Sequence, residues 1–163
     1  MLTAILVLAL SAVSSGKPAC AVDTEAMLAL DVRAFDQDVD GGWTALSFKP
    51  GCEEAAADLI AHYRQRHPDV RYMPYLLPFH EGQIRLGLGQ TNRAIALFEA
   101  ARQPKAPIGF DTGWNFYIDA SIAFARGDLK DLRAARAQLA VLPLPPEFPT
   151  SIKWPMNLMP SML

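Results

Sequence analysis

Three glycines recur at a fixed interval, and this constrains the fold more than any other feature of the sequence. Gly51, Gly89 and Gly127 are each separated by 38 residues. Intervals of this length are typical of arrays in which one supersecondary unit stacks on the next. The sequence therefore predicts an internal repeat through most of the chain.

The stretch after each glycine has the pattern of an amphipathic helix. The three stretches are "GCEEAAADLIAHYRQRHP", "GQTNRAIALFEAARQP" and "GDLKDLRAARAQLAVLP". Positions five, nine and twelve residues beyond each glycine are apolar in eight of nine cases, and Arg136 is the exception. Spacings of four and three residues place these positions on one helix face, which we expect to be buried. Its apolar members are Ala56, Ile60, Tyr63, Ala94, Phe98, Ala101, Leu132 and Leu139.

Turn and cap residues are found at both ends of these helices. A glycine suits the left-handed backbone conformation that ends a preceding helix. Asp128 and Thr91 are candidates to cap the helix that follows. Pro68, Pro104 and Pro143 are expected to end it. Each unit is therefore expected to contain two helices joined by a glycine turn.

The first helix of each unit is less regular than the second. The clearest is the third, "GWNFYIDASIAFARG", and the second is expected to begin at about Pro78. The first, within "GWTALSFKP", must be short, because Gly41 and Gly42 precede Trp43 and Pro50 ends the helix. One further helix, "DTEAMLALDVRAF", is expected before the repeats, where it would cover the exposed end of the stack.

The second unit resembles the tetratricopeptide repeat family. The second helix of that family has a small residue, three others and a Phe, followed by Pro, and "GQTNRAIALFEAARQP" has this order. The resemblance covers about residues 38–143. It implies an all-α fold, a right-handed superhelical stack of about three helix-turn-helix repeats with an N-terminal helix and a Pro-rich C-terminal cap. A related helical repeat or a generic array of αα-hairpins is the alternative.

The N-terminal residues have the pattern of a secretory signal peptide. Residues 2–13 are an apolar run, and an A-x-A cleavage site precedes Val22. The run is shorter than the about 20 residues that span a bilayer, so no stable membrane insertion is expected after cleavage. We therefore expect a signal peptide over residues 1–21, a helical-repeat domain over residues 22–143, and a periplasmic or secreted bacterial protein.

The two cysteines leave two arrangements open. Cleavage before Cys20 permits a Cys20–Cys52 disulfide in an oxidising compartment. Cleavage after Ala21 removes Cys20 and leaves Cys52 as a lone thiol. The sequence does not choose between them.

The C-terminal segment, residues 144–163, contains five prolines and cannot form a long helix. Trp154, Met156, Leu158 and Met159 make it apolar. An apolar patch of this kind is seldom left exposed. We therefore expect the segment to cap the last helix pair or to form a homodimer contact.

By the resemblance, the first helices line a concave face that binds a partner. Trp and Tyr side chains on such a face would anchor an extended peptide or a partner helix. The implied function is a non-enzymatic protein–protein or peptide interaction module without a cofactor. Burial of the Trp and Tyr side chains between helices is the alternative. The expected inward positions are Lys49, Phe79, Gln83, Leu86, Trp114, Tyr117 and Ser121.

The stretch "FDQDVDGGW" begins like a calcium-binding loop. Asp36, Asp38 and Asp40 alternate ahead of a turn glycine. A twelve-residue loop from Asp36 ends at Ser47, where a bidentate Glu is required. These carboxylates are therefore only a weak calcium candidate. The loop is better interpreted as the connector into the first repeat, with Trp43 entering the core.

Other classes of function have less support. A site built on residues 36–40 and His80 would indicate a metal-dependent or hydrolytic periplasmic protein, but no zinc spacing, nucleophile elbow or phosphate loop accompanies it. A small secreted inhibitor or immunity-type protein is a further alternative. The net charge is −2, and the basic residues are spread along helices without a run. No nucleic-acid partner is therefore expected.

Overall fold

A computed structural model describes residues 20–71, 74–103 and 110–142. These residues contain eight helices and no strand, so the predicted all-α class is confirmed. No helix within the described ranges is both long enough and apolar enough to cross a bilayer. The Pro-rich cap and nearly all of the predicted signal peptide lie outside these residues.

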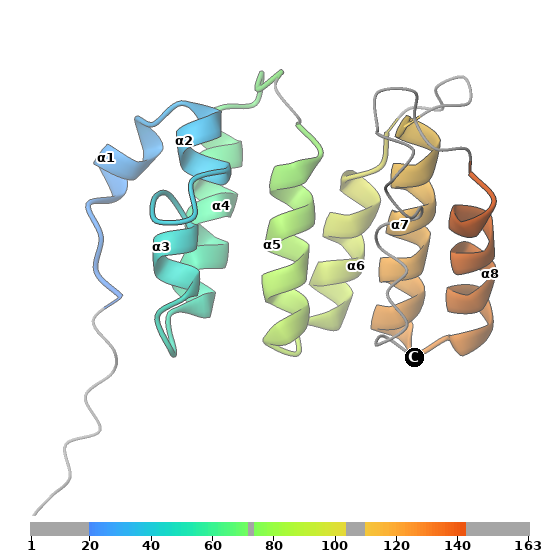
Figure 1. Ribbon diagram of the computed structural model, residues 1–163. Helices are drawn as coiled ribbons and strands as arrows, with labels where there is room; N and C mark the ends of the chain where they lie inside the picture. The colour runs from blue at the N-terminus through green and yellow to red at the C-terminus, as the bar shows by residue number, and fades with distance from the viewer. Residues whose placement is uncertain (1–19, 72–73, 104–109, 143–163) are drawn as a thin grey trace, which may run out of the picture.

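Six of the eight helices form three consecutive pairs, which stand side by side and alternate in direction (Figure 1). Helix α5 packs against both α4 and α6, and α7 packs against both α6 and α8. Most contacts in the row therefore join helices that follow one another along the chain. The paired helices are α3 (Thr44–Ser47), α4 (Glu53–Arg66), α5 (Leu76–Gly87), α6 (Thr91–Ala100), α7 (Phe110–Arg126) and α8 (Leu129–Ala140).

The N-terminal segment forms two short helices, and the prediction of one continuous helix is wrong. Helices α1 (Thr24–Leu28) and α2 (Val32–Asp36) are separated by a turn. The Asp23 carboxylate caps α1, and the Asp31 carboxylate accepts hydrogen bonds from the first backbone N–H groups of α2. Because Asp31 bonds to the backbone ahead of it, it starts a new helix instead of continuing the old one.

The three repeat glycines confirm the predicted turns. Gly51, Gly89 and Gly127 have φ angles of 81°, 75° and 70°. Residues with a Cβ atom rarely adopt this left-handed conformation, which explains why glycine recurs there. The regular interval in the sequence therefore corresponds to one turn geometry used three times.

The helix ends agree only partly with prediction. The Asp128 carboxylate caps α8, whereas Thr91 is the first residue of α6 and follows Gln90, which makes no side-chain cap. Helix α5 begins two residues before Pro78, because a proline is tolerated in the first turn, where the N–H has no partner within the helix. Helix α7 begins at Phe110, ahead of the predicted start.

The predicted apolar face is buried in the first two units. Its six members there, Ala56, Ile60, Tyr63, Ala94, Phe98 and Ala101, are each at most 1% exposed. In the third unit Leu139 is buried, Leu132 is half-buried and Arg136 is exposed, while Ala135 takes the buried place beside Leu139. Helix α8 is the last described helix and packs on α7, so fewer of its positions are covered.

Two apolar clusters make up the core. The first contains residues of α1, α2, α3 and α4 and of the start of α5. In this cluster the rings of Phe35 and Tyr63 are stacked at a centroid distance of 3.8 Å. The second joins α5, α6 and α7 around Phe79 and Phe98. Gly82 allows α5 to approach α6 closely, because a Cβ atom there would lie only 2.7 Å from the Phe98 ring.

A disulfide joins Cys20 to Cys52, with a Cα–Cα distance of 5.4 Å. It connects the segment before α1 to the residue that precedes α4. Of the two arrangements that the sequence left open, the structure has the bridged one. Both cysteines of the chain are used in this bond.

Candidate interaction surface

Aromatic side chains connect α5 to α7. The centroid of the Phe79 ring lies 5.0 Å from that of Trp114 and 5.4 Å from that of Tyr117. Tyr75, the residue before α5, lies 4.8 Å from Trp114. Phe79 is buried, whereas Tyr75, Trp114 and Tyr117 are half-buried around it. The group therefore has an apolar base and a partly exposed aromatic upper layer.

The same aromatic group continues from α5 to the residue before α3. The His80 ring lies 6.0 Å from the Phe79 ring and 5.2 Å from the Trp43 ring. One row of rings thus extends across the first helices of all three pairs. We name this row the aromatic band: Trp43, Tyr75, Phe79, His80, Trp114 and Tyr117.

The indole of Trp114 has a fixed orientation. Its Nε1–H donates a hydrogen bond of 2.8 Å to the carbonyl oxygen of Ala101, at the C-terminal end of α6. The ring is half-buried and belongs to the second apolar cluster. Trp114 and Tyr117 therefore contribute to the core and to the surface at the same time.

The other predicted inward positions are distributed differently. Leu86 is half-buried and packs against the second cluster. Gln83 is exposed on α5, and the Ser121 hydroxyl donates to the Tyr117 carbonyl within α7. Lys49 is exposed in the turn after α3. Four of the seven predicted residues therefore lie in or against one cluster, and Lys49 lies at the edge of the first pair.

Two large exposed apolar side chains, at the end of α3 and on α7, were not among the predicted site residues. Phe48 and Phe124 are 74% and 66% exposed. Each precedes a repeat glycine by three residues, and Leu86 has the equivalent place in the second unit. Phe124 is also seven residues after Tyr117, so both lie on one face of α7. The repeat interval itself was the signal that could have identified them.

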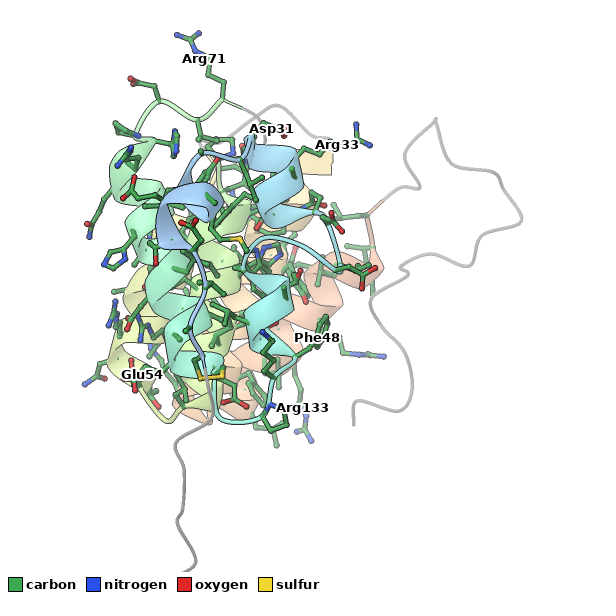
Figure 2. The ribbon with its side chains drawn as sticks, turned by 90° about the vertical axis from the view of Figure 1, so that its left-hand side faces the viewer. Asp31, Arg33, Phe48, Glu54, Arg71 and Arg133 are labelled. Atoms are coloured by element: carbon green, nitrogen blue, oxygen red, sulfur yellow. A yellow bond between two sulfur atoms is a disulfide. The ribbon has the colours of Figure 1, made fainter. Side chains whose placement is uncertain are left out.

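Figure 2 views the row of helices from its N-terminal end. In this view Phe48 lies on the side of the molecule that α3 occupies, and α4 lies on the other side (Figure 2). The exposed Phe48 ring therefore extends the surface of the first helices beyond the aromatic band.

The acidic loop and His80 come together in the structure. The Asp36 Oδ1 atom accepts hydrogen bonds from His80 Nδ1 at 2.8 Å and from Trp43 Nε1 at 2.9 Å, and Oδ2 accepts from the Gln37 amide at 2.6 Å. Burial by itself raises the pKa of Asp36, but the hydrogen bond and charge of His80, with the bonds from Trp43 and Gln37, lower it below 3.8. Asp36 therefore remains ionised and joins α2 to α5.

The three alternating carboxylates of the acidic loop lie in different environments. Asp36 is buried against His80, whereas Asp38 and Asp40 are exposed. The Asp38 carboxylate accepts a hydrogen bond from the backbone N–H of Asp40. Within the described residues, no group of three or more His, Cys, Asp and Glu side chains is placed to hold a metal ion.

His80 has the geometry of an oriented imidazole. Its Nδ1 atom is bonded to the buried Asp36 carboxylate, and its side chain is 20% exposed. A carboxylate that binds one ring nitrogen leaves the other free to exchange protons, as in a general base. The hydroxyls of Thr44 and Ser47 on α3 are bonded to backbone carbonyls. The pair therefore has an oriented base without an activated nucleophile on α3.

Two further charged side chains of α5, Glu81 and Arg85, are almost fully buried. Glu81 accepts hydrogen bonds from Arg64 of α4 at 2.6 Å and from Arg93 of α6 at 3.1 Å. Arg85 donates to Asp58 of α4 at 2.5 Å. We name these five residues the charged network. In the sequence this network is indicated only by the i, i+4 spacing of Glu81 and Arg85 on α5, because the other three residues belong to other helices.

No protein-family model, no curated protein sequence and no solved structure matches this chain. The geometry of its surfaces is therefore the basis for inferring what it does.

Proposed function

We propose that this protein is an exported helical-repeat module, similar to tetratricopeptide repeat proteins, that binds a protein or peptide on the surface of its first helices. The observation that carries the proposal is the aromatic band. Half-buried Trp and Tyr side chains held by a rigid base are typical anchors of protein interfaces, because they bury much apolar area at small entropic cost. Three helix pairs with one turn geometry support a right-handed superhelical stack with a concave face.

The exposed side chains indicate the chemistry of the partner. The exposed rings of Phe48 and Phe124, and the half-buried ring of Trp114, would contact apolar side chains of the partner. Gln83 is exposed on α5, the first helix of the middle pair, and its amide would form hydrogen bonds to a peptide backbone. An extended or helical segment with regularly spaced apolar residues would match this surface.

The disulfide and the N-terminal pattern support the exported location. Disulfides persist in oxidising compartments and are rare in the cytosol. The apolar run over residues 2–13 matches the hydrophobic region of a signal peptide. In this proposal cleavage takes place before Cys20, because the mature chain must retain that half of the Cys20–Cys52 bond.

Partner capture tests the proposed function. The tagged protein is used to isolate partners from the native envelope fraction, which are then identified by mass spectrometry. We expect a Phe48→Ala/Phe124→Ala variant and a Trp114→Ala/Tyr117→Ala variant to lose the partner while the far-ultraviolet circular dichroism of the exposed pair stays unchanged. Val141→Ala is the matched control, because Val141 is an exposed apolar residue that follows α8. Undiminished capture by both folded double variants would reject the proposal.

A second candidate function, hydrolysis by general-base catalysis, is supported by the Asp36–His80 pair. In that case an activated water molecule would be the nucleophile. Release of nitrophenol from nitrophenyl acetate should then fall to the uncatalysed rate in His80→Ala. Equal rates for the wild type and His80→Ala would exclude this candidate, and metal analysis of the purified protein would test its metal-dependent form.

A further inference from the structure

A groove of about 440 Å³ lies between α4 and α6. The base includes Glu81 of α5, and the sides come from the two flanking helices. None of the residues around this groove belongs to the aromatic band. The groove is therefore separate from the surface of the first helices. Its polar and aliphatic lining includes Arg64, Gln65, Glu81, Arg93, Ala96 and Leu97.

The charged network gives this groove an excess of positive charge. Glu81 has a side chain that is only 2% exposed and faces three guanidinium groups, those of Arg64, Arg85 and Arg93. Asp58 is the second carboxylate of the network and pairs with Arg85. Three cations thus meet two anions, so one positive charge is left over. Of the three arginines, Arg64 and Arg93 are the two that line the groove, and an anion from solution can reach them because they are partly exposed.

The two arginines at the groove have hydrogen-bond donors to spare. A guanidinium group has five N–H donors, and the bonds to Glu81 use one Nη atom of Arg64 and one of Arg93. The side chains of Arg64 and Arg93 are 32% and 49% exposed. Glu81 holds both guanidinium groups in place, which lowers the entropy lost when a ligand binds. Their planar forks match the two oxygens of a carboxylate.

We propose that this groove binds an acidic segment of a partner protein, through a side-chain carboxylate that bridges Arg64 and Arg93. The aliphatic sides of the groove, formed by Leu97 and small alanines such as Ala96, permit close approach of the residues beside that carboxylate. Charge complementarity selects an anionic partner, and the aliphatic sides favour an acidic residue next to Leu over a bare inorganic anion. This site goes beyond the proposed peptide surface and does not depend on it.

Two matched peptides test the site on the full chain. The probes are acetyl-Leu-Glu-Leu-amide and acetyl-Leu-Gln-Leu-amide, and two-dimensional ¹H–¹⁵N NMR follows the backbone amides of Arg64, Arg93 and Leu97. We expect the Glu peptide alone to shift these amides. Its affinity should fall about tenfold in Arg93→Gln, since one charge-assisted hydrogen bond is lost. Added salt should weaken binding as well.

Two variants keep the result interpretable. Arg93→Lys preserves the charge and one bond to Glu81 but lacks the planar fork, so we expect an affinity between those of the wild type and Arg93→Gln. Arg66→Gln removes an exposed arginine of α4 that pairs with Glu25, and it should bind as the wild type does. Equal shifts with the Gln peptide, equally strong shifts with inorganic phosphate, the same loss in Arg66→Gln, or no shift at millimolar peptide would each overturn the proposal.

Discussion

At the scale of single residues, Asp36 has the most consequential environment. Its carboxylate is almost fully buried and accepts hydrogen bonds from His80, Trp43 and Gln37. These partners come from α5 and from the loop before α3, so one side chain connects three parts of the chain. An ionised carboxylate in such a place is stabilising only while its donors are present.

Asp36 is expected to make stability depend on acid pH. Its pKa is lower in the folded protein than the ordinary 3.8, so its contribution is complete above that value and is lost as the pH falls through the folded pKa. At neutral pH Asp36→Asn should lower the free energy of unfolding by about 1–3 kcal/mol. Urea unfolding from pH 7 down to pH 2 should show the two proteins converging in acid. A difference that stays constant with pH would contradict this assignment.

At the scale of elements, α5 is the central helix of the described chain. It directs Phe79 toward α7, Gly82 toward α6, His80 toward α2 and Glu81 toward α4 and α6. Gly82 lies inside this helix, where a glycine costs about 1 kcal/mol of stability relative to Ala. The cost is offset by the close approach that the glycine allows.

Two glycines of α5 should respond differently to replacement by Ala. In Gly82→Ala the new Cβ atom would lie 2.7 Å from the Phe98 ring, so overpacking should lower the free energy of unfolding by about 1–3 kcal/mol. Gly87→Ala is the control, because nothing lies within 4 Å of its Cβ position. Thermal unfolding should show a lower midpoint for Gly82→Ala and no loss for Gly87→Ala. Equal midpoints would mean that α5 and α6 separate at little cost.

At the scale of the whole molecule, the first core cluster is closed by a covalent bond. Cys20 and Cys52 are 32 residues apart and enclose α1, α2 and α3. These helices have only five, five and four residues, too few for independent stability. Their retention against α4 therefore depends on packing and on the disulfide together.

Loss of the disulfide should destabilise the protein strongly. A closed loop of this length restricts the unfolded chain by about 3–4 kcal/mol in the chain-entropy model. Cys20→Ser/Cys52→Ser should therefore unfold at lower urea concentration than the oxidised wild type. Reductant should shift the wild type to the same midpoint and leave the double variant unchanged. If reductant left the urea midpoint of the wild type unchanged, the disulfide would contribute nothing to the free energy of unfolding.

The features that depended on local spacing were predictable. The glycine turns followed from the interval of 38 residues, and the buried faces of α4 and α6 followed from helical periodicity. The break at Asp31 was missed because its capping role competes with an apolar pattern that continues through it. The repeat alone could not predict whether Arg136 is buried or exposed, because the burial of a residue on α8 depends on which helices cover α8.

The sequence by itself determined the all-α class, the three glycine turns and the order of the helix pairs. Those features arise from backbone conformation and from side chains three or four residues apart, which act locally. Only the tertiary structure decided that Asp36 meets His80 across 44 residues and that Glu81 holds Arg64 and Arg93. Such pairs form when separate helices pack, because burial removes water and leaves each charged group dependent on its neighbours. The aromatic band and the charged groove both belong to this second kind.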